Sequence, residues 1–243
     1  MLNLFQHLSN CGLLFKSQIE QTLKQVQGDN NIKKAGFTLA EVLLVITIIG
    51  IVASLTIPGL ITSVQESQYK IAFKKNFANL SNATNQILED NPNISDDWTN
   101  HDKVRDEYGN YFTFIKTCNS YTPMNGICWA TDGTKYLNDT GGGPLSLDQH
   151  SIAILNDGTF LNFNLSGGIC QGTTPCLATI SIDVNGFKKP NKLGKDTFNV
   201  FITSKRLVPS APNGFYGCDP TSSSGRLYLG EACASLVLTN TDY

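Results

Sequence analysis

Residues 37 to 64 form an apolar stretch, FTLAEVLLVITIIGIVASLTIPGLITSV, that contains a single charged residue, Glu41. About 20 apolar residues are enough to span the hydrocarbon core of a bilayer, so the stretch predicts a transmembrane helix. A carboxylate placed inside such a helix costs about 2.5–3.5 kcal/mol on membrane-insertion scales. The chain therefore needs a specific reason to keep a charge at Glu41.

The residues on either side of the apolar stretch predict its orientation. Lys33 and Lys34 stand directly before it, and positive charges tend to remain on the cytoplasmic side of a membrane. We therefore expect the N-terminus in the cytoplasm and everything after Val64 on the far side. No convincing small-residue cleavage site follows the apolar stretch, so we expect it to remain in the product rather than to be removed as a secretory signal peptide.

The helical pattern continues beyond the apolar stretch to about residue 90. Apolar residues recur there at close to helical spacing, with Lys, Gln, Asn and Ser between them: Val64, Ile71, Phe77, Leu80, Ala83, Ile87 and Leu88. This pattern predicts one helix of roughly fifty residues, apolar all round at first and amphipathic afterwards. Pro58 should bend or locally open it, because a proline ring removes one backbone hydrogen bond and collides with the preceding turn.

From about residue 90 the pattern changes to short strands and turns. Pro92 and two consecutive aspartates end the helix, and alternating aromatic or β-branched residues predict strands at 108–117, 178–186, 197–203 and 234–240. Residues 151–165 contain two alternating runs around Asn156-Asp157-Gly158, which predicts a hairpin because Asp-Gly readily adopts positive φ. The expected fold class is α+β, with a long N-terminal helix packed on an antiparallel sheet.

Six of the seven cysteines follow the apolar stretch and form three sequence-local couples. The couples predict three short-range disulfides, Cys118–Cys128, Cys170–Cys176 and Cys218–Cys233. Free thiols or metal ligands are the alternative, but there is no CxxC pair and the three histidines stand apart, so the usual zinc spacing is missing. Disulfides persist in oxidising compartments, which agrees with a location outside the cytoplasm.

The sequence offers little for catalysis or for metal binding. His101 and His150 could act as bases, but neither lies in a nucleophile motif, and we expect no enzymatic activity and no cofactor. Asp183, Asn185 and Asp196 are weak candidates for calcium ligands. Their order differs from an EF-hand loop and four lysines lie among them, so we expect a plain turn and no metal.

Charge also fails to indicate nucleic acid as a partner. The chain has a formal net charge of −2, and the part after Gly36 carries fourteen basic against eighteen acidic residues. A nucleic-acid-binding domain usually has a basic patch, and no such patch dominates this sequence.

The residues KKAGFTLAE followed by the apolar run resemble the N-terminal signature of type IV pilins and of the pseudopilins of type II secretion systems. The resemblance rests on the basic residues, Gly36, Phe37, the glutamate at the fifth place after that glycine, and a proline near the end of the run. It covers roughly residues 33 to 90. Pilin-like subunits also have a long helix against an antiparallel sheet.

The resemblance implies roles for individual residues. Gly36 would be the residue after which a prepilin peptidase cuts, and Phe37 would become the new N-terminus and be N-methylated. Glu41 would direct assembly, because in the family the amine of one subunit is thought to meet the glutamate of its neighbour. Such a buried ion pair specifies alignment better than it adds stability. Pro58 and Gly50 match a region where helices of family filaments loosen.

The same resemblance implies four parts: a cleaved leader at 1–36, a transmembrane and assembly helix at 37–63, its amphipathic continuation at 64–90, and an extracytoplasmic β-rich domain at 91–243. Family leaders are commonly short, so this one departs from the pattern. Both a long leader and a start at a non-Met codon are compatible with the sequence.

The expected function is therefore that of a structural subunit of a type IV pilus or a type II secretion pseudopilus, in the inner membrane and then in a periplasmic or surface filament. The expected partners are other pilin or pseudopilin subunits, prepilin peptidase, the inner-membrane assembly platform and membrane lipid. Two alternatives remain: a minor tip subunit acting in adhesion or DNA uptake, and a simple membrane-anchored binding domain.

Overall fold

The computed structural model describes residues 37–139, 150–170, 174–211, 217–219 and 229–241, and for 166–170 and 174 only the backbone. The chain divides into two units, with the boundary between Pro58 and Gly59. The long helix α2 comprises Leu39–Asp90, a span of 52 residues, which confirms the expected helix of roughly fifty. It ends just before Pro92, as the sequence predicts, because the residue preceding a proline is restricted to extended backbone.

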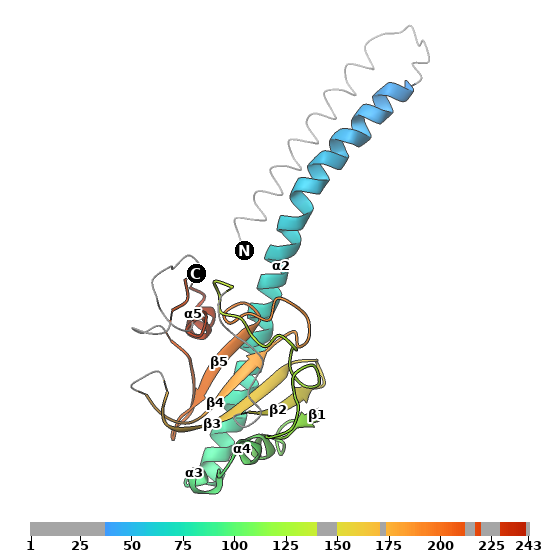
Figure 1. Ribbon diagram of the computed structural model, residues 1–243. Helices are drawn as coiled ribbons and strands as arrows, with labels where there is room; N and C mark the ends of the chain where they lie inside the picture. Colours follow the sequence, from blue (N-terminus) through green and yellow to red (C-terminus); the bar gives the residue numbers. More distant parts are fainter. Residues whose placement is uncertain (1–36, 140–149, 171–173, 212–216, 220–228, 242–243) are drawn as a thin grey trace. The chain divides into compact units, whose positions relative to one another are not determined.

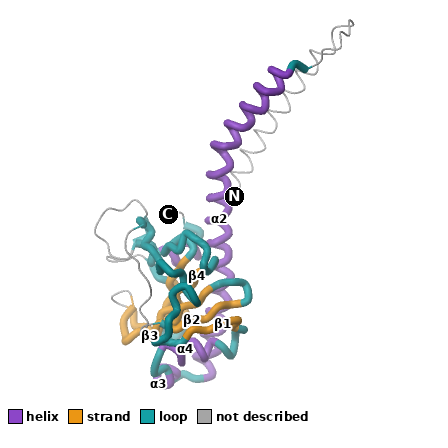
Figure 2. The backbone as a smooth tube through the Cα atoms, turned by 45° about the vertical axis from the view of Figure 1, so that its right-hand side comes forward, coloured by secondary structure: helices purple, strands orange, loops and turns teal. Residues whose placement is uncertain are grey.

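In the described part of the second unit, six strands form one sheet, in the order β1-β2-β3-β4-β5-β6 with every neighbouring pair antiparallel. The strands are β1 Phe114–Cys118, β2 Ser151–Leu155, β3 Phe160–Cys170, β4 Thr174–Asp183, β5 Thr197–Ile202 and β6 Leu207–Pro209. The C-terminal part of α2 lies along one face of this sheet (Figures 1 and 2). The predicted α+β fold class is confirmed.

The hairpin between β2 and β3 forms at the predicted turn. Gly158 has a φ of +86°, and its N–H donates to the carbonyl of Leu155 at 3.0 Å. The Asp157 carboxylate accepts a hydrogen bond from the N–H of Thr159 at 3.1 Å, which holds the turn together. The register that follows pairs Ala153 with Leu161, so both strands present their apolar residues to the same faces.

The face of α2 that enters the core agrees with the prediction from Phe77 onward and differs from it before that residue. The buried residues are Phe73, Asn76, Leu80, Ala83, Thr84 and Ile87, at spacings of three and four. Val64 and Ile71 are exposed, although the pattern assigned them to the apolar face. Phe73 anchors the helix instead, because its ring stacks on Phe198 of β5 with 4.3 Å between ring centroids.

Both faces of the sheet are covered. On the face of α2, Ala153, Leu155, Leu161 and Phe163 belong to the main core, together with Tyr108. On the other face, Ile152, Ile154 and Phe160 contact a second cluster that contains Met124 and Trp129 from the loop after β1. Side chains along β2 alternate between the two faces and therefore pack in two separate hydrophobic clusters. This explains why the strand is buried along its whole length.

Among the described residues, three short helices lie outside the sheet, and two of them correct the predicted strands. The short helix α3 is Ile94–Asp97, α4 is His101–Tyr108 and α5 is Cys233–Thr239. The strand predicted at 108–117 starts only at Phe114, because Tyr108 belongs to α4 and its buried hydroxyl lies 2.6 Å from that of Thr84.

The strand predicted at 234–240 is helix α5, despite its β-branched and apolar residues. The neighbouring sheet edge is already occupied, because β6 pairs with β5 there. Ala234 and Val237, three residues apart, are buried on one side of α5, and Asn240 ends the helix with a φ of 58°. Tertiary contacts therefore overrode the local preference for a strand.

The stacking of Phe73 on Phe198 makes a prediction about stability. Phe73→Ala should lower the free energy of unfolding by about 3–5 kcal/mol, because it removes a fully buried ring and leaves a cavity. Urea denaturation of the full chain in detergent, followed by the fluorescence of the buried Trp98 and Trp129, measures the change. Phe77→Ala is the control from the same helix, since Phe77 is only partly buried, and it should cost clearly less. Equal losses in the two variants would contradict the proposed anchor.

Candidate functional site

The charged residue of the apolar stretch takes part in the start of α2. Thr38 precedes the helix, and the Glu41 carboxylate accepts hydrogen bonds from the Thr38 N–H at 2.9 Å and from its hydroxyl at 3.0 Å. The Glu41 N–H in turn donates to the Thr38 hydroxyl oxygen at 3.2 Å. This reciprocal arrangement is a capping box, which satisfies N–H groups that have no partner within the helix. The pattern T-x-x-E predicts it, but the sequence analysis considered only the charge of Glu41 and its role in assembly.

The remainder of this segment presents apolar side chains outward. Phe37 is 88% exposed and Leu39 80%, and an 18-residue window of α2 long and apolar enough to cross a membrane contains no buried residue. A continuous exposed surface of this kind is rare on soluble proteins. The segment therefore fits a membrane anchor, with lipid or other protein covering the surface.

The hydroxyl groups of the apolar segment are satisfied within the helix. Thr47 donates to the carbonyl of Leu43 at 2.9 Å, Ser54 to that of Ile51 at 2.8 Å, and Thr56 to that of Val52 at 3.0 Å. Internal hydrogen bonds of this type let polar side chains enter lipid at low cost. Glu41 remains the one side chain of the segment that carries a charge.

Small residues and a proline interrupt this segment. Pro58 lies inside α2 and has no N–H to donate to the carbonyl of Ser54, four residues earlier. A Cβ atom added at Gly50 or Gly59 would meet no other atom of the chain within 4 Å. Nothing in the described part of this chain needs these glycines to be small, whereas a closely packed neighbouring helix would.

The predicted cleavage site lies at the border of what the structure describes. Residues 1–36, which end with Gly36, are outside the described residues, and Phe37 is the first described residue. The Cys170–Cys176 pairing also lies outside them, because the side chain of Cys170 is not described.

Two of the three predicted disulfides are present in the described residues. Cys118 and Cys128 are joined with 6.2 Å between their Cα atoms, and Cys218 and Cys233 with 4.9 Å. The loop closed by the first carries Met124, which is fully buried against the sheet. This loop is therefore part of the core.

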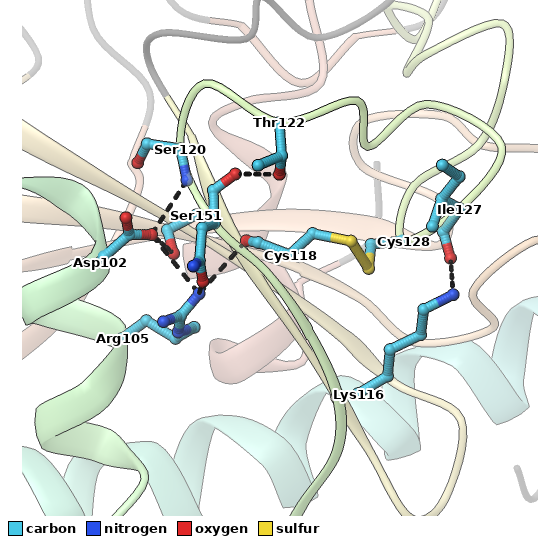
Figure 3. The surroundings of a disulfide bond; sticks show 10 residues. Asp102, Arg105, Lys116, Cys118, Ser120, Thr122, Ile127, Cys128 and Ser151 are labelled. Atoms are coloured by element: carbon cyan, nitrogen blue, oxygen red, sulfur yellow. Dashed lines mark hydrogen bonds and ion pairs between the residues drawn. A yellow bond between two sulfur atoms is a disulfide. The ribbon is translucent and has the colours of Figure 1, made fainter.

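Sequence reasoning missed a polar network that ties helix α4 to this loop (Figure 3). The Arg105 guanidinium, with a side chain only 6% exposed, donates to the carbonyl of Cys118 at 3.3 Å and to the side chain of Asn119 at 2.8 Å. Asp102 accepts hydrogen bonds from the N–H of Ser120 at 3.0 Å and the hydroxyl of Ser151 at 2.6 Å. The network fixes the ends of β1 and β2 and is structural in character.

The structure brings together the three residues considered as calcium candidates. Asp183 ends β4 and Asp196 precedes β5, and both are fully buried. Burial, and for Asp183 also the nearby charge of Asp196, raises the pKa of both carboxyl groups. The backbone N–H of Asn185 donates to Asp183 at 3.1 Å. Within the described residues, no three His, Cys, Asp or Glu side chains gather as a metal site, so two carboxylates alone form this cluster.

A further, half-buried acid lies beside the second disulfide. Burial raises the pKa of Glu231 to about 7. Glu231 precedes Cys233 by two residues, in the segment that the Cys218–Cys233 bond holds against Leu229 and Leu137. The segment therefore contains a carboxyl group that favours its neutral form.

Comparison with known proteins gives one match. A family model described as the prokaryotic N-terminal methylation motif matches residues 31–57, which include Gly36, Phe37 and Glu41. Searches of curated proteins and of solved structures found no match to the chain.

Glu231 makes a prediction about pH. Its pKa in the folded chain, about 7, lies above its ordinary value of 4.5, so the folded state keeps the proton longer than the unfolded state. Its contribution to stability is complete below pH 4.5 and is lost as the pH rises toward about 7. Urea unfolding of Glu231→Gln across this range should show a shallower fall in stability than the native chain. Glu89→Gln, at an exposed position on α2, should keep the native slope, and an unchanged slope in Glu231→Gln would contradict the assignment.

Proposed function

Because residues 31–57 carry the prokaryotic N-terminal methylation motif, which is the signature of type IV pilins and pseudopilins, we propose that this chain is a structural, non-enzymatic subunit of a type IV pilus or a type II secretion pseudopilus. The single observation that carries the proposal is the match of this motif to a segment whose apolar surface is exposed and whose only charge is Glu41. The motif marks a substrate of prepilin peptidase.

Cleavage after Gly36 would change the electrostatics at the start of α2. The new amine of Phe37 would be a cation next to Thr38, whose N–H already bonds the Glu41 carboxylate. Both bonds from Thr38 end on Oε2 of Glu41, so a cation could bind Oε1 while the capping box stays intact. An amine from a neighbouring subunit at that position would compensate the carboxylate in an apolar filament core and set the register between helices.

The exposed apolar surface of α2 would be covered first by lipid and later by other subunits. Before assembly, lipid would cover it, with Lys33 and Lys34 on the cytoplasmic side and the sheet outside the cytoplasm. During assembly, other subunits delivered by an inner-membrane platform would replace the lipid. The open space at Gly50 and Gly59 would admit a neighbouring helix at close range.

Processing can be tested by mass spectrometry of the protein from cells with and without prepilin peptidase. We expect a chain that begins at Phe37 and carries one added methyl group only when the peptidase is present. A Gly36→Ile variant, whose larger side chain should block cleavage, serves as the matched control and should keep Lys33 and Lys34 in both strains. A native chain that keeps these lysines in both strains would favour the simple membrane-anchored domain.

Assembly can be tested with Glu41→Gln, which removes the charge but keeps a residue that also completes a capping box. We expect the sheared filament fraction to fall to about a tenth or less of the native amount, the effect of ~1.4 kcal/mol, while the membrane fraction and the cleavage at Gly36 stay unchanged. Glu89→Gln is the control, since Glu89 is an exposed acid on the same helix but outside the apolar segment. Normal assembly of Glu41→Gln would refute the role of charge pairing in register.

A further inference from the structure

The β4–β5 connection, residues 184–196, lies against α2 at the point where the apolar stretch ends. Lys195 of the connection pairs with Glu66 of the helix at 3.0 Å. Beside this pair the two segments enclose a hollow of about 270 Å³, whose lining includes Thr62, Gln65, Tyr69 and Lys189. All of these residues belong to the second unit of the chain.

The sequence predicts the level of this hollow relative to a membrane. The apolar stretch ends at Val64, and Glu66 is the first charged residue after Glu41. A helix that spans lipid must therefore leave the hydrocarbon within the turns that line the hollow. At ~1.5 Å per residue, the helix rises by about 10 Å from Thr62 to Tyr69, which is comparable with the roughly 5–8 Å depth of one headgroup layer. Lipid headgroups would therefore lie beside the hollow.

Positive charge is concentrated at the same place. Residues 62–70 and the connection together contain five lysines against two acidic residues, Glu66 and the fully buried Asp196. The remainder of the chain after Gly36 contains nine basic against sixteen acidic residues. An anionic lipid surface would therefore repel most of the domain and attract the part where the connection meets the helix.

One lysine of the hollow remains available for a ligand. Lys192 and Lys195 already pair with Asp139 and Glu66. Lys189 is exposed, and none of the ion pairs among the described residues includes its ammonium group. The charge of Lys189 therefore has no counterpart in this part of the chain.

We propose that this hollow binds the headgroup of an anionic phospholipid, in the leaflet where α2 leaves the membrane. The ammonium group of Lys189 would pair with the phosphodiester, since lysine and phosphate form strong charge-assisted hydrogen bonds. The Gln65 amide and the Tyr69 hydroxyl, which line the same hollow, are further donors. Tyrosine is also enriched at membrane–water interfaces. The proposal rests on the membrane anchor and does not depend on cleavage or assembly, so its failure would leave the proposed function intact.

The experiment is amide hydrogen exchange of the full chain in lipid nanodiscs. One set of discs contains phosphatidylcholine alone, and the other contains phosphatidylcholine mixed with phosphatidylglycerol. We expect peptides from residues 184–196 to exchange about fivefold more slowly in the anionic discs, because one lysine near an anionic surface strengthens binding by about that factor. Peptides from the β5–β6 turn, at the opposite end of the sheet, should exchange equally in both discs. Equal exchange of residues 184–196 in the two kinds of disc would overturn the proposal.

Lys189→Gln should abolish the slower exchange in anionic discs and leave exchange in phosphatidylcholine discs unchanged, because this side chain is exposed and unpaired among the described residues. Lys205→Gln is the matched control, since it removes the same charge from an exposed position on the β5–β6 turn, and it should keep the full effect. Slower exchange that persists in Lys189→Gln would contradict the assignment of the headgroup to this lysine. Inorganic phosphate added to phosphatidylcholine discs should have no effect, and slower exchange there would refute a lipid ligand in favour of a free anion.

Discussion

The constraint on which the rest of this molecule depends is the change in surroundings along helix α2. Its first part presents apolar side chains on every side, so water must be excluded all round it. Its second part buries only one face, led by Phe73, Leu80 and Ile87, and the sheet covers that face. The same backbone geometry serves both surroundings, because a helix satisfies its own hydrogen bonds wherever it lies. The sequence of side chains alone decides what must cover each part.

The same constraint determines how each charged side chain has to be compensated. Arg105 is almost fully buried, yet its guanidinium meets Asp102, Asp106 and a carbonyl, so its burial holds a loop in place at little cost. Glu41 is exposed, and Thr38 supplies only two of the contacts that a carboxylate can accept. Asp183 is buried and keeps one oxygen unpaired. The charge of Arg105 is thus compensated within the chain, and burial raises the pKa of Asp183 so that its neutral form is favoured. The carboxylate of Glu41, by contrast, would need a cation from outside in an apolar surrounding.

The sequence predicted those features that depend on neighbouring residues. The apolar run, the helix end before Pro92 and the turn at Asp157-Gly158 each follow from local chemistry, and each is present. The predictions failed where contacts between distant segments determine the structure. Phe73 lies in the core, where its ring stacks on Phe198, whereas Ile71 is exposed. Residues Cys233–Thr239 form helix α5, and β6 rather than this segment pairs with β5.

The candidate sites divide in the same way. The pattern from Gly36 to Glu41 is local and specific, so the sequence alone identified it, although the T-x-x-E capping box within it went unrecognised. The network of Asp102 and Arg105 and the burial of Asp183 depend on contacts across the fold. A run of aspartates and lysines in a turn predicts a solvated loop, and only the structure reveals that the carboxylates point inward while Lys192 and Lys195 pair with other carboxylates.

The β4–β5 connection also contacts the part of α2 that lies in the second unit. Lys195, next to Asp196, pairs with Glu66 of the helix, and Lys189 and Pro190 line a hollow together with Thr62 and other helix residues. The Lys195–Glu66 pair is partly exposed, so it contributes less than about 1 kcal/mol. Most of the attachment between the sheet and the helix therefore has to come from apolar contacts, led by the stacking of Phe73 on Phe198.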